Sequence, residues 1–281
     1  MTVTELKKMI TGSLAEHVGA AEAEAMCREI VRYLLGYEPV DAVINGAREI
    51  LPQTAERASA IVARVVAGEP LQYVLGSAWF MGMELSVSPA VLIPRPETSQ
   101  LVDIITDQWR GRSDLRVLDI GTGSGCIAIA LARALPFAQV DATDVSAAAL
   151  EVAAANARAL KARVSLRLED ITTAEPQESS YGIIVSNPPY IAMRERAGMD
   201  ARVYDHEPSG ALFVPDADPL VFYRAIARYA ATALAHDGAL YFEINPLFVT
   251  QLRAMLGAEG FSHVDIQRDY KGNLRFAVCR R

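Results

Sequence analysis

The chain has 281 residues, 51% of them hydrophobic, which is enough for one large domain or for a large and a small one. Its formal net charge of −7 has the wrong sign for a protein that binds by neutralising phosphates, and this argues against a nucleic-acid binder. The three cysteines, Cys27, Cys126 and Cys279, are scattered and form no CxxC or Cys/His cluster, so neither a disulfide framework nor a zinc site is indicated.

The first seventy residues have the pattern of a small helical bundle. Between Ala21 and Leu35 apolar residues recur every four positions, and Gly36 follows as a stop signal. A second helix is expected from Thr54 to Ala67, with Gly68 after it. We predict that residues 1–70 form a helical domain that recognises the substrate; the alternative is a domain that only stabilises its neighbour.

A different pattern begins near residue 71. The segment LQYVLGSAWFMGMELSVSP contains short β-favouring runs broken by Gly76 and Gly82, which predicts a hairpin. In the segment VLIPRPETS that follows, Pro94 and Pro96 favour extended backbone. We therefore expect residues 71–97 to form a hairpin and a linker.

Strands and helices alternate from residue 98 to residue 281. The expected strands are LRVLDI, AQVDAT, RVSLRL, YGIIVS, GALYFEI, 261–266 and 274–278, and the expected helices are 98–109, 124–134, 146–160, 219–234 and 247–256. This alternation predicts an α/β fold with a mostly parallel, seven-stranded sheet covered on both faces. The last two strands have no room for a crossover helix between them, so the closing strand is expected to be antiparallel.

A nucleoside site is predicted where the first of these strands ends in Gly121-Thr122-Gly123-Ser124-Gly125. Glycines at this turn let the backbone come close to a ligand at the carboxyl edge of the sheet. Cys126 stands where a dinucleotide fingerprint needs its third glycine, which favours a cofactor without a pyrophosphate, such as S-adenosylmethionine. Asp144 ends the next strand and is predicted to bind the ribose hydroxyls, and Asp170 and Ile171 follow the third strand, where an adenine would lie.

A reaction site is predicted at Asn187-Pro188-Pro189-Tyr190, directly after the fourth strand. An amide nitrogen is a poor nucleophile because its lone pair is delocalised. The Asn187 side-chain oxygen and the Pro188 carbonyl could accept its two N–H groups and direct the lone pair toward a sulfonium methyl. Tyr190 could stack on the planar target, and no metal is needed. A simple Asn-Pro turn is the structural alternative.

Three segments, GEPLQYVLGSAWFMGMELSVSPAVLIPRPET, LDIGTGSGCIAIALA and IIVSNPPYI, resemble the HemK/PrmC family of protein-(glutamine-N5) methyltransferases. The resemblance implies a class I methyltransferase (Rossmann-like) fold and methylation of the Gly-Gly-Gln glutamine of class 1 peptide chain release factors. It also implies that residues 187–190 hold that glutamine. It places Gly121 to Gly125, Asp144, the Asp170–Ile171 region and Asn187 against S-adenosylmethionine.

The chain departs from the family pattern at Ser99, at His206 and at Asn245. These departures concern the local shape of the pocket wall and do not affect the predicted reaction class. The alternative function is an exocyclic-amine methyltransferase acting on DNA or RNA, which the acidic balance disfavours. Neither a signal peptide nor an apolar run of ~20 residues is evident, so we expect a cytoplasmic enzyme with no membrane partner. We also expect a monomer with no direct nucleic-acid partner.

Overall fold

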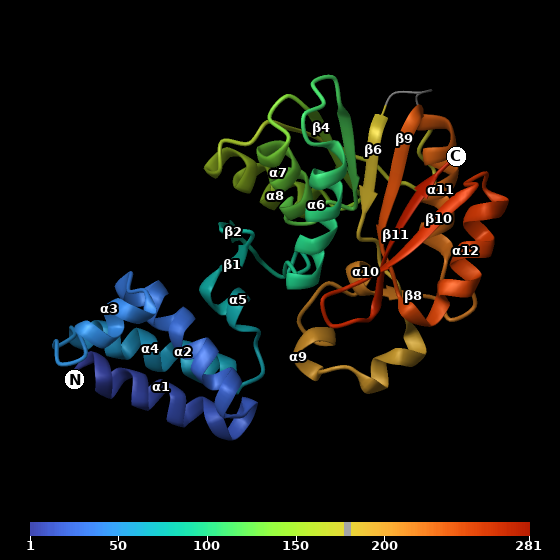
Figure 1. The fold of residues 1–281 in the computed structure, drawn as a ribbon. Coiled ribbons are helices and arrows are strands. Elements are labelled where there is room, and N and C mark those ends of the chain that lie inside the picture. Colours follow the sequence, from blue (N-terminus) through green and yellow to red (C-terminus); the bar gives the residue numbers. More distant parts are fainter. Residues whose placement is uncertain (177–180) are drawn as a thin grey trace. The chain divides into compact units, whose positions relative to one another are not determined.

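The computed structural model describes residues 1–176 and 181–281, and these form two compact units (Figure 1). The first unit contains residues 1–76 together with residues 201–206. The second lies within residues 77–200 and 207–281. In the part of the chain that the structure describes, no helix combines the length and the apolar character needed to cross a membrane.

The first unit is a bundle of helices around its own apolar core. Its helices are α1 (Val3–Val18), α2 (Ala20–Leu35), α3 (Pro39–Ile44), α4 (Pro52–Val66) and α5 (Leu71–Leu75). Helix α1 begins with a capping box between Thr2 and Glu5, and Leu6, Ile10 and Leu14 recur every four residues on its fully buried face. The two helices predicted here correspond to α2 and α4, with small differences at their ends.

The predicted hairpin forms, but it is shorter than expected. Strands β1 (Ser77–Phe80) and β2 (Met83–Ser86) pair antiparallel. The β-favouring run before Gly76 takes no part in the hairpin, because Leu71–Leu75 is helix α5, which ends at Gly76 with a φ of 74°. Helix α6 (Pro96–Trp109) begins two residues earlier than predicted, since a proline fits the first turn of a helix, where its missing N–H costs nothing.

The second unit is built on a seven-stranded sheet in the order β10-β11-β9-β6-β3-β4-β5. Its strands are β3 (Arg116–Ile120), β4 (Gln139–Asp144), β5 (Val164–Leu168), β6 (Tyr181–Ser186), β9 (Leu234–Glu243), β10 (His263–Arg268) and β11 (Leu274–Arg280). All neighbouring pairs from β9 to β5 are parallel, whereas β11 runs antiparallel to both β9 and β10. The predicted class I methyltransferase architecture, with its antiparallel closing strand, is therefore confirmed.

Helices cover both faces of this sheet (Figure 1). The main helices are α6, α7 (Cys126–Ala134), α8 (Ala147–Ala159), α11 (Val221–Ala233) and α12 (Val249–Ala258). Side chains alternate along a strand, so successive buried residues of β3 pack against helices on opposite faces of the sheet. Val117 packs with α6 and α7, and Leu118 packs with α11 and α12. With both faces covered, the loops at the carboxyl ends of β3, β4 and β6 are where a ligand can enter.

Shorter elements lie between β6 and α11 and before α12. They are β7 (Ile191–Ala192), β8 (Phe213–Val214), α9 (Ala201–Tyr204), α10 (Ser209–Leu212) and the 3-10 turns Met193–Gly198 and Pro246–Phe248. Strands β7 and β8 pair parallel to each other. None of these was predicted, because elements of two to six residues are too short to show a periodicity.

Candidate active site

The glycine turn after β3 adopts backbone conformations that favour glycine. Gly121 and Gly123 adopt positive φ values of 73° and 55°, and a Cβ on either residue would project into open space. Gly125 has a different role: at a φ of 82°, its Cβ would lie 3.1 Å from Ile129 and 3.3 Å from Ala153. The first two glycines therefore keep the turn open to a ligand, while Gly125 lets α7 pack closely.

A buried carboxylate, that of Asp119, stabilises this turn through hydrogen bonds. Asp119 is fully buried, and its Oδ2 accepts hydrogen bonds from the Thr122 hydroxyl at 2.7 Å and from the Ala128 N–H at 3.2 Å. Its Oδ1 has no hydrogen-bond partner among the described residues. Burial raises the pKa of Asp119 to about 7, and the two hydrogen bonds oppose this shift only in part.

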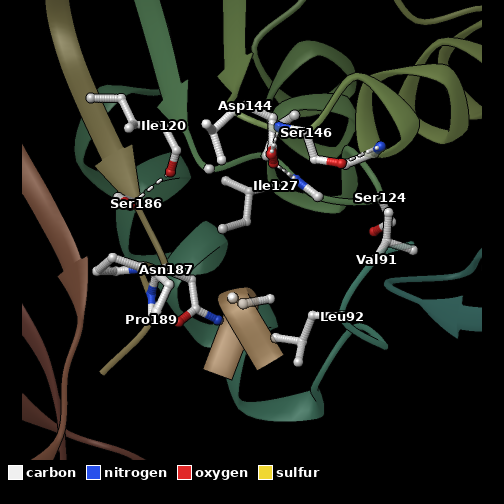
Figure 2. Close-up of a pocket in the computed structure, with 18 of the residues that line it drawn as sticks. Val91, Leu92, Ile120, Ser124, Ile127, Asp144, Ser146, Ser186, Asn187 and Pro189 are labelled. Atoms are coloured by element: carbon white, nitrogen blue, oxygen red, sulfur yellow. Dashed lines mark hydrogen bonds between the residues drawn. The ribbon is translucent and has the colours of Figure 1, made fainter. Parts of the chain in front are cut away.

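Asp144 lies at the end of β4 and faces the same turn (Figure 2). Its two oxygens accept the N–H groups of Gly123 and Ser146, each at 2.9 Å. A carboxylate oxygen has lone pairs for more than one donor, so each can still accept a hydroxyl from a ligand. The two acceptor oxygens at this point thus fit a ribose with two adjacent hydroxyl groups.

These groups line a cavity of about 270 Å³ at the carboxyl edge of the sheet. Nearly all the predicted site residues line it, namely Gly121, Thr122, Gly123, Ser124, Asp144, Asp170, Ile171, Asn187, Pro188 and Pro189. Figure 2 shows Asp144, Ser124 and Asn187 arranged around this space. The structure therefore brings the predicted cofactor turn and the predicted reaction loop to one pocket.

Tyr190 and Gly125 are the predicted site residues that do not line this cavity. The phenol of Tyr190 donates a hydrogen bond to Glu243 at 3.1 Å, and its ring packs against the core between the sheet and α11. Burial, and then the nearby charge of Glu243, raise the pKa of the Tyr190 hydroxyl. The predicted stacking of Tyr190 on a planar target therefore does not correspond to its position.

Buried polar residues that the sequence reasoning did not assign hold the wall of the pocket. Glu207 accepts the Ile93 N–H at 3.2 Å and forms an ion pair with Arg95, a pocket residue. Thr98 donates to Glu243 at 2.7 Å, and both side chains are 2% exposed. Two of these residues could have been found from motifs in the sequence, because Thr98 is the last residue of PRPET and Glu243 lies two positions before Asn245.

Family models match both units: the PrmC N-terminal domain matches residues 5–76, and the methyltransferase small domain matches residues 97–203. The release factor glutamine methyltransferase of Bacteroides thetaiotaomicron is 42% identical over 97% of this chain and 98% of its own length. The protein of the same name from Deinococcus radiodurans is 33% identical over 99% of both chains.

The fold has its own match among solved structures. A methyltransferase from Pyrococcus furiosus superposes with a TM-score of 0.52 at 18% identity, over 79% of this chain and 97% of the other, which concerns the fold alone. The near full-length identity to the Bacteroides and Deinococcus proteins goes further, and it agrees with a pocket that joins the glycine turn to Asn187-Pro188-Pro189. The chain belongs to the release factor glutamine methyltransferase family, and it is an S-adenosylmethionine-dependent methyltransferase.

Proposed function

We propose that this protein transfers a methyl group from S-adenosylmethionine to the side-chain amide nitrogen of the glutamine in the Gly-Gly-Gln motif of class 1 peptide chain release factors. The observation that carries this proposal is the single cavity in which Asp144 and the glycine turn lie with Asn187 and Pro188. The 42% identity over nearly the whole chain to a release factor glutamine methyltransferase supports the same substrate.

The cofactor would occupy the part of the cavity formed by the ends of β3, β4 and β5. The open turn at Gly121 and Gly123 admits its methionine portion, Asp144 accepts its ribose hydroxyls, and Asp170 and Ile171 border its adenine. When bound, S-adenosylmethionine supplies an electrophilic methyl group on a sulfonium sulfur.

Asn187 and Pro188 would position the nucleophile. Both line the cavity directly after β6, and both bear carbonyl oxygens that accept N–H groups. With its two N–H groups held, the glutamine nitrogen presents its lone pair to the methyl group, and its proton leaves after transfer. This is positioning and electrostatic preorganisation, with no strong base required.

The helical unit is the surface that we assign to recognition of the intact release factor. A glutamine side chain is small, so specificity has to come from contacts far from the reacting nitrogen. Helix α3 offers such a surface, because Val40, Val43 and Ile44 are 67%, 73% and 76% exposed. A monomer acting in the cytoplasm on a protein, with no direct nucleic-acid partner, is consistent with three free, buried cysteines and a net charge of −7.

Incubation with radiolabelled S-adenosylmethionine and either a class 1 release factor or DNA tests the proposal. We expect label on the release factor, located by peptide mapping to the glutamine of Gly-Gly-Gln, and none on DNA. A release factor whose motif glutamine is replaced by alanine is the matched control. Label on DNA alone, or on the alanine-substituted factor, would overturn the assignment.

A further inference from the structure

Two buried polar side chains, Thr98 and Glu243, connect partly buried Asn187 of the reaction loop to the core of the second unit. Thr98 lies in the first turn of α6, Glu243 ends β9, and Asn187 follows β6. The Thr98 hydroxyl donates to Glu243 Oε2 at 2.7 Å, and Asn187 Nδ2 donates to Thr98 Oγ1 at 3.4 Å. The chain of hydrogen bonds therefore runs from the cavity residue Asn187 to a buried carboxylate.

The direction of these hydrogen bonds is determined by the carboxylate. An ionised carboxylate only accepts, and a hydroxyl has a single proton, so Thr98 uses that proton on Glu243. Toward Asn187, Thr98 can then act only as an acceptor. The part of the Asn187 amide that faces Thr98 must be its NH₂ group, and the oxygen Oδ1 is turned to the opposite side.

This orientation matters for the proposed chemistry. The two ends of an asparagine amide have nearly the same shape, so packing alone discriminates poorly between them. With Oδ1 toward the substrate, Asn187 accepts an N–H from the glutamine amide. In the reverse orientation the NH₂ group of Asn187 would face the NH₂ group of the glutamine, and two donors cannot form a hydrogen bond. A residue that sets the orientation therefore sets the activity of the loop.

Glu243 accepts a hydroxyl on each carboxylate oxygen, which is the arrangement of an ionised carboxylate, although the net shift of its pKa is upward. Burial raises the pKa of Glu243, as does the carboxylate of Glu97 on α6, while hydrogen bonds from Thr98 and Tyr190 and the charge of Arg275 on β11 lower it. Its Oε1 accepts the Tyr190 hydroxyl at 3.1 Å, so each carboxylate oxygen receives one hydroxyl. Glu243 thereby holds both ends of the loop, Asn187 through Thr98 and Tyr190 directly.

We infer that Thr98 and Glu243 are positioning residues that hold the Asn187 amide with its oxygen toward the acceptor nitrogen. The inference rests on the proposed function, because it gives that oxygen its task. Neither residue transfers a proton to or from the substrate. Their contribution is to exclude the reversed amide and to keep the loop in place.

Thr98→Val tests the inference, since it keeps the shape of the side chain and removes the acceptor. We expect kcat to fall about 10-fold, as for a small misplacement of a reacting group, while the affinity for S-adenosylmethionine measured by calorimetry stays within twofold. Thr98→Ser, which restores the hydroxyl, should recover most of the rate. Thr106→Val is the matched control, because Thr106 lies on the same helix, is 9% exposed and has an Oγ1 without a hydrogen-bond partner among the described residues.

A pH series separates orientation from a merely structural role. Protonated Glu243 could itself donate to Thr98 and free the Thr98 hydroxyl to donate to Asn187. The ratio of the wild-type kcat to the Thr98→Val kcat should therefore shrink as pH falls through the Glu243 pKa. A wild-type rate in Thr98→Val, no recovery in Thr98→Ser, or a pH-independent ratio would each overturn the inference. If Thr98→Val does not fold, Thr98→Ala takes its place. The ratio is measured on whichever substrate wild type labels, so a wrong substrate assignment is recognised separately, by the absence of label on the release factor.

Discussion

At the residue scale, this site depends on a few carboxylates in contrasting surroundings. Asp144 lies partly buried at the cavity and accepts two backbone N–H groups. Asp119, one strand away, is fully buried with one oxygen unpartnered among the described residues. We propose that this type of side chain binds a ligand at Asp144, whereas at Asp119 it stabilises the turn, and substitution can separate these two roles.

Replacing Asp144 by alanine should weaken cofactor binding. The substitution removes the charged acceptor that we propose for the ribose hydroxyls, and the expected loss is about 1.5–3 kcal/mol of binding free energy. Calorimetric titration with S-adenosylmethionine measures it, with Asp141→Asn as a control on the same strand. An unchanged affinity in a folded variant would show that Asp144 does not hold the ribose.

Replacing Asn187 by alanine should reduce turnover with little effect on cofactor affinity. Loss of one preorganised hydrogen-bonding group at a reacting centre typically costs about 10²–10³ in rate. Single-turnover labelling of a release factor measures this, and calorimetry measures the cofactor affinity. Near-normal turnover would mean that Asn187-Pro188-Pro189-Tyr190 is only a turn.

Asp119 should make stability depend on pH. Its folded-state pKa of about 7 lies above the reference value of 3.8, so the folded protein holds this proton more tightly than the unfolded chain. This bound proton contributes fully to the free energy of unfolding below about pH 4, and the contribution is lost as pH rises to about 7. Its size is at most about 4 kcal/mol, because a difference of one between the folded and unfolded pKa corresponds to about 1.36 kcal/mol. Denaturant unfolding should therefore show a steeper fall over this range in wild type than in Asp119→Asn. Exposed Asp114→Asn should behave as wild type; equal pH dependence in Asp119→Asn and wild type would contradict the assignment.

At the element scale, one buried amide joins three segments around the pocket. Asn156 on α8 is 1% exposed; it accepts the Ser86 N–H at 2.7 Å and donates to the Ser86 and Ser124 carbonyls, both at 2.9 Å. Ser86 ends strand β2, and Ser124 lies in the glycine turn. Asn156 thereby holds the hairpin and the turn on one helix.

Substitution of Asn156 by leucine should destabilise the second unit. One buried backbone group, the Ser124 carbonyl, would lose its partner at about 1–3 kcal/mol, and the two part-buried groups of Ser86 would lose theirs at a smaller cost, so we expect a loss of about 2 kcal/mol or more in unfolding free energy. Cofactor affinity should weaken as well, because Ser124 lines the cavity. Chemical denaturation is the measurement, and Arg158→Leu, on the exposed side of the same helix, is the control. A loss no larger than that of the control would refute the proposed tie.

At the scale of the whole molecule, recognition and chemistry are assigned to different units. The variant Val40→Ser, Val43→Ser, Ile44→Ser changes only exposed positions of α3. If α3 contacts the release factor, kcat/KM on the intact factor should fall at least about 10-fold, or ~1.4 kcal/mol. Cofactor affinity and the rate of methylation of a short Gly-Gly-Gln peptide should not change, because that peptide does not reach α3.

Phe137→Ser, in the second unit and 73% exposed, is the matched control for this surface. It should leave methylation of the intact factor unchanged. Equal losses on the intact factor and on the peptide would instead give the helical unit a stabilising role. A wild-type rate on the intact factor would remove α3 from the interface.

The sequence alone determined the order of the large elements, the parallel sheet with its antiparallel closing strand, and the two motifs that meet at the pocket. These features follow from local rules: hydrophobic periodicity identifies helices and strands, and in parallel strands the carboxyl ends share one edge, which brings Gly121, Asp144 and Asn187 together. Only the tertiary structure decided that Leu71–Leu75 is helical, that Gly125 serves packing and that Tyr190 turns from the cavity toward Glu243. It also revealed the contact of Thr98 with Glu243, which lie 145 positions apart in the chain. Each of these outcomes depends on which distant side chains fill the space around a residue, and no local pattern encodes that.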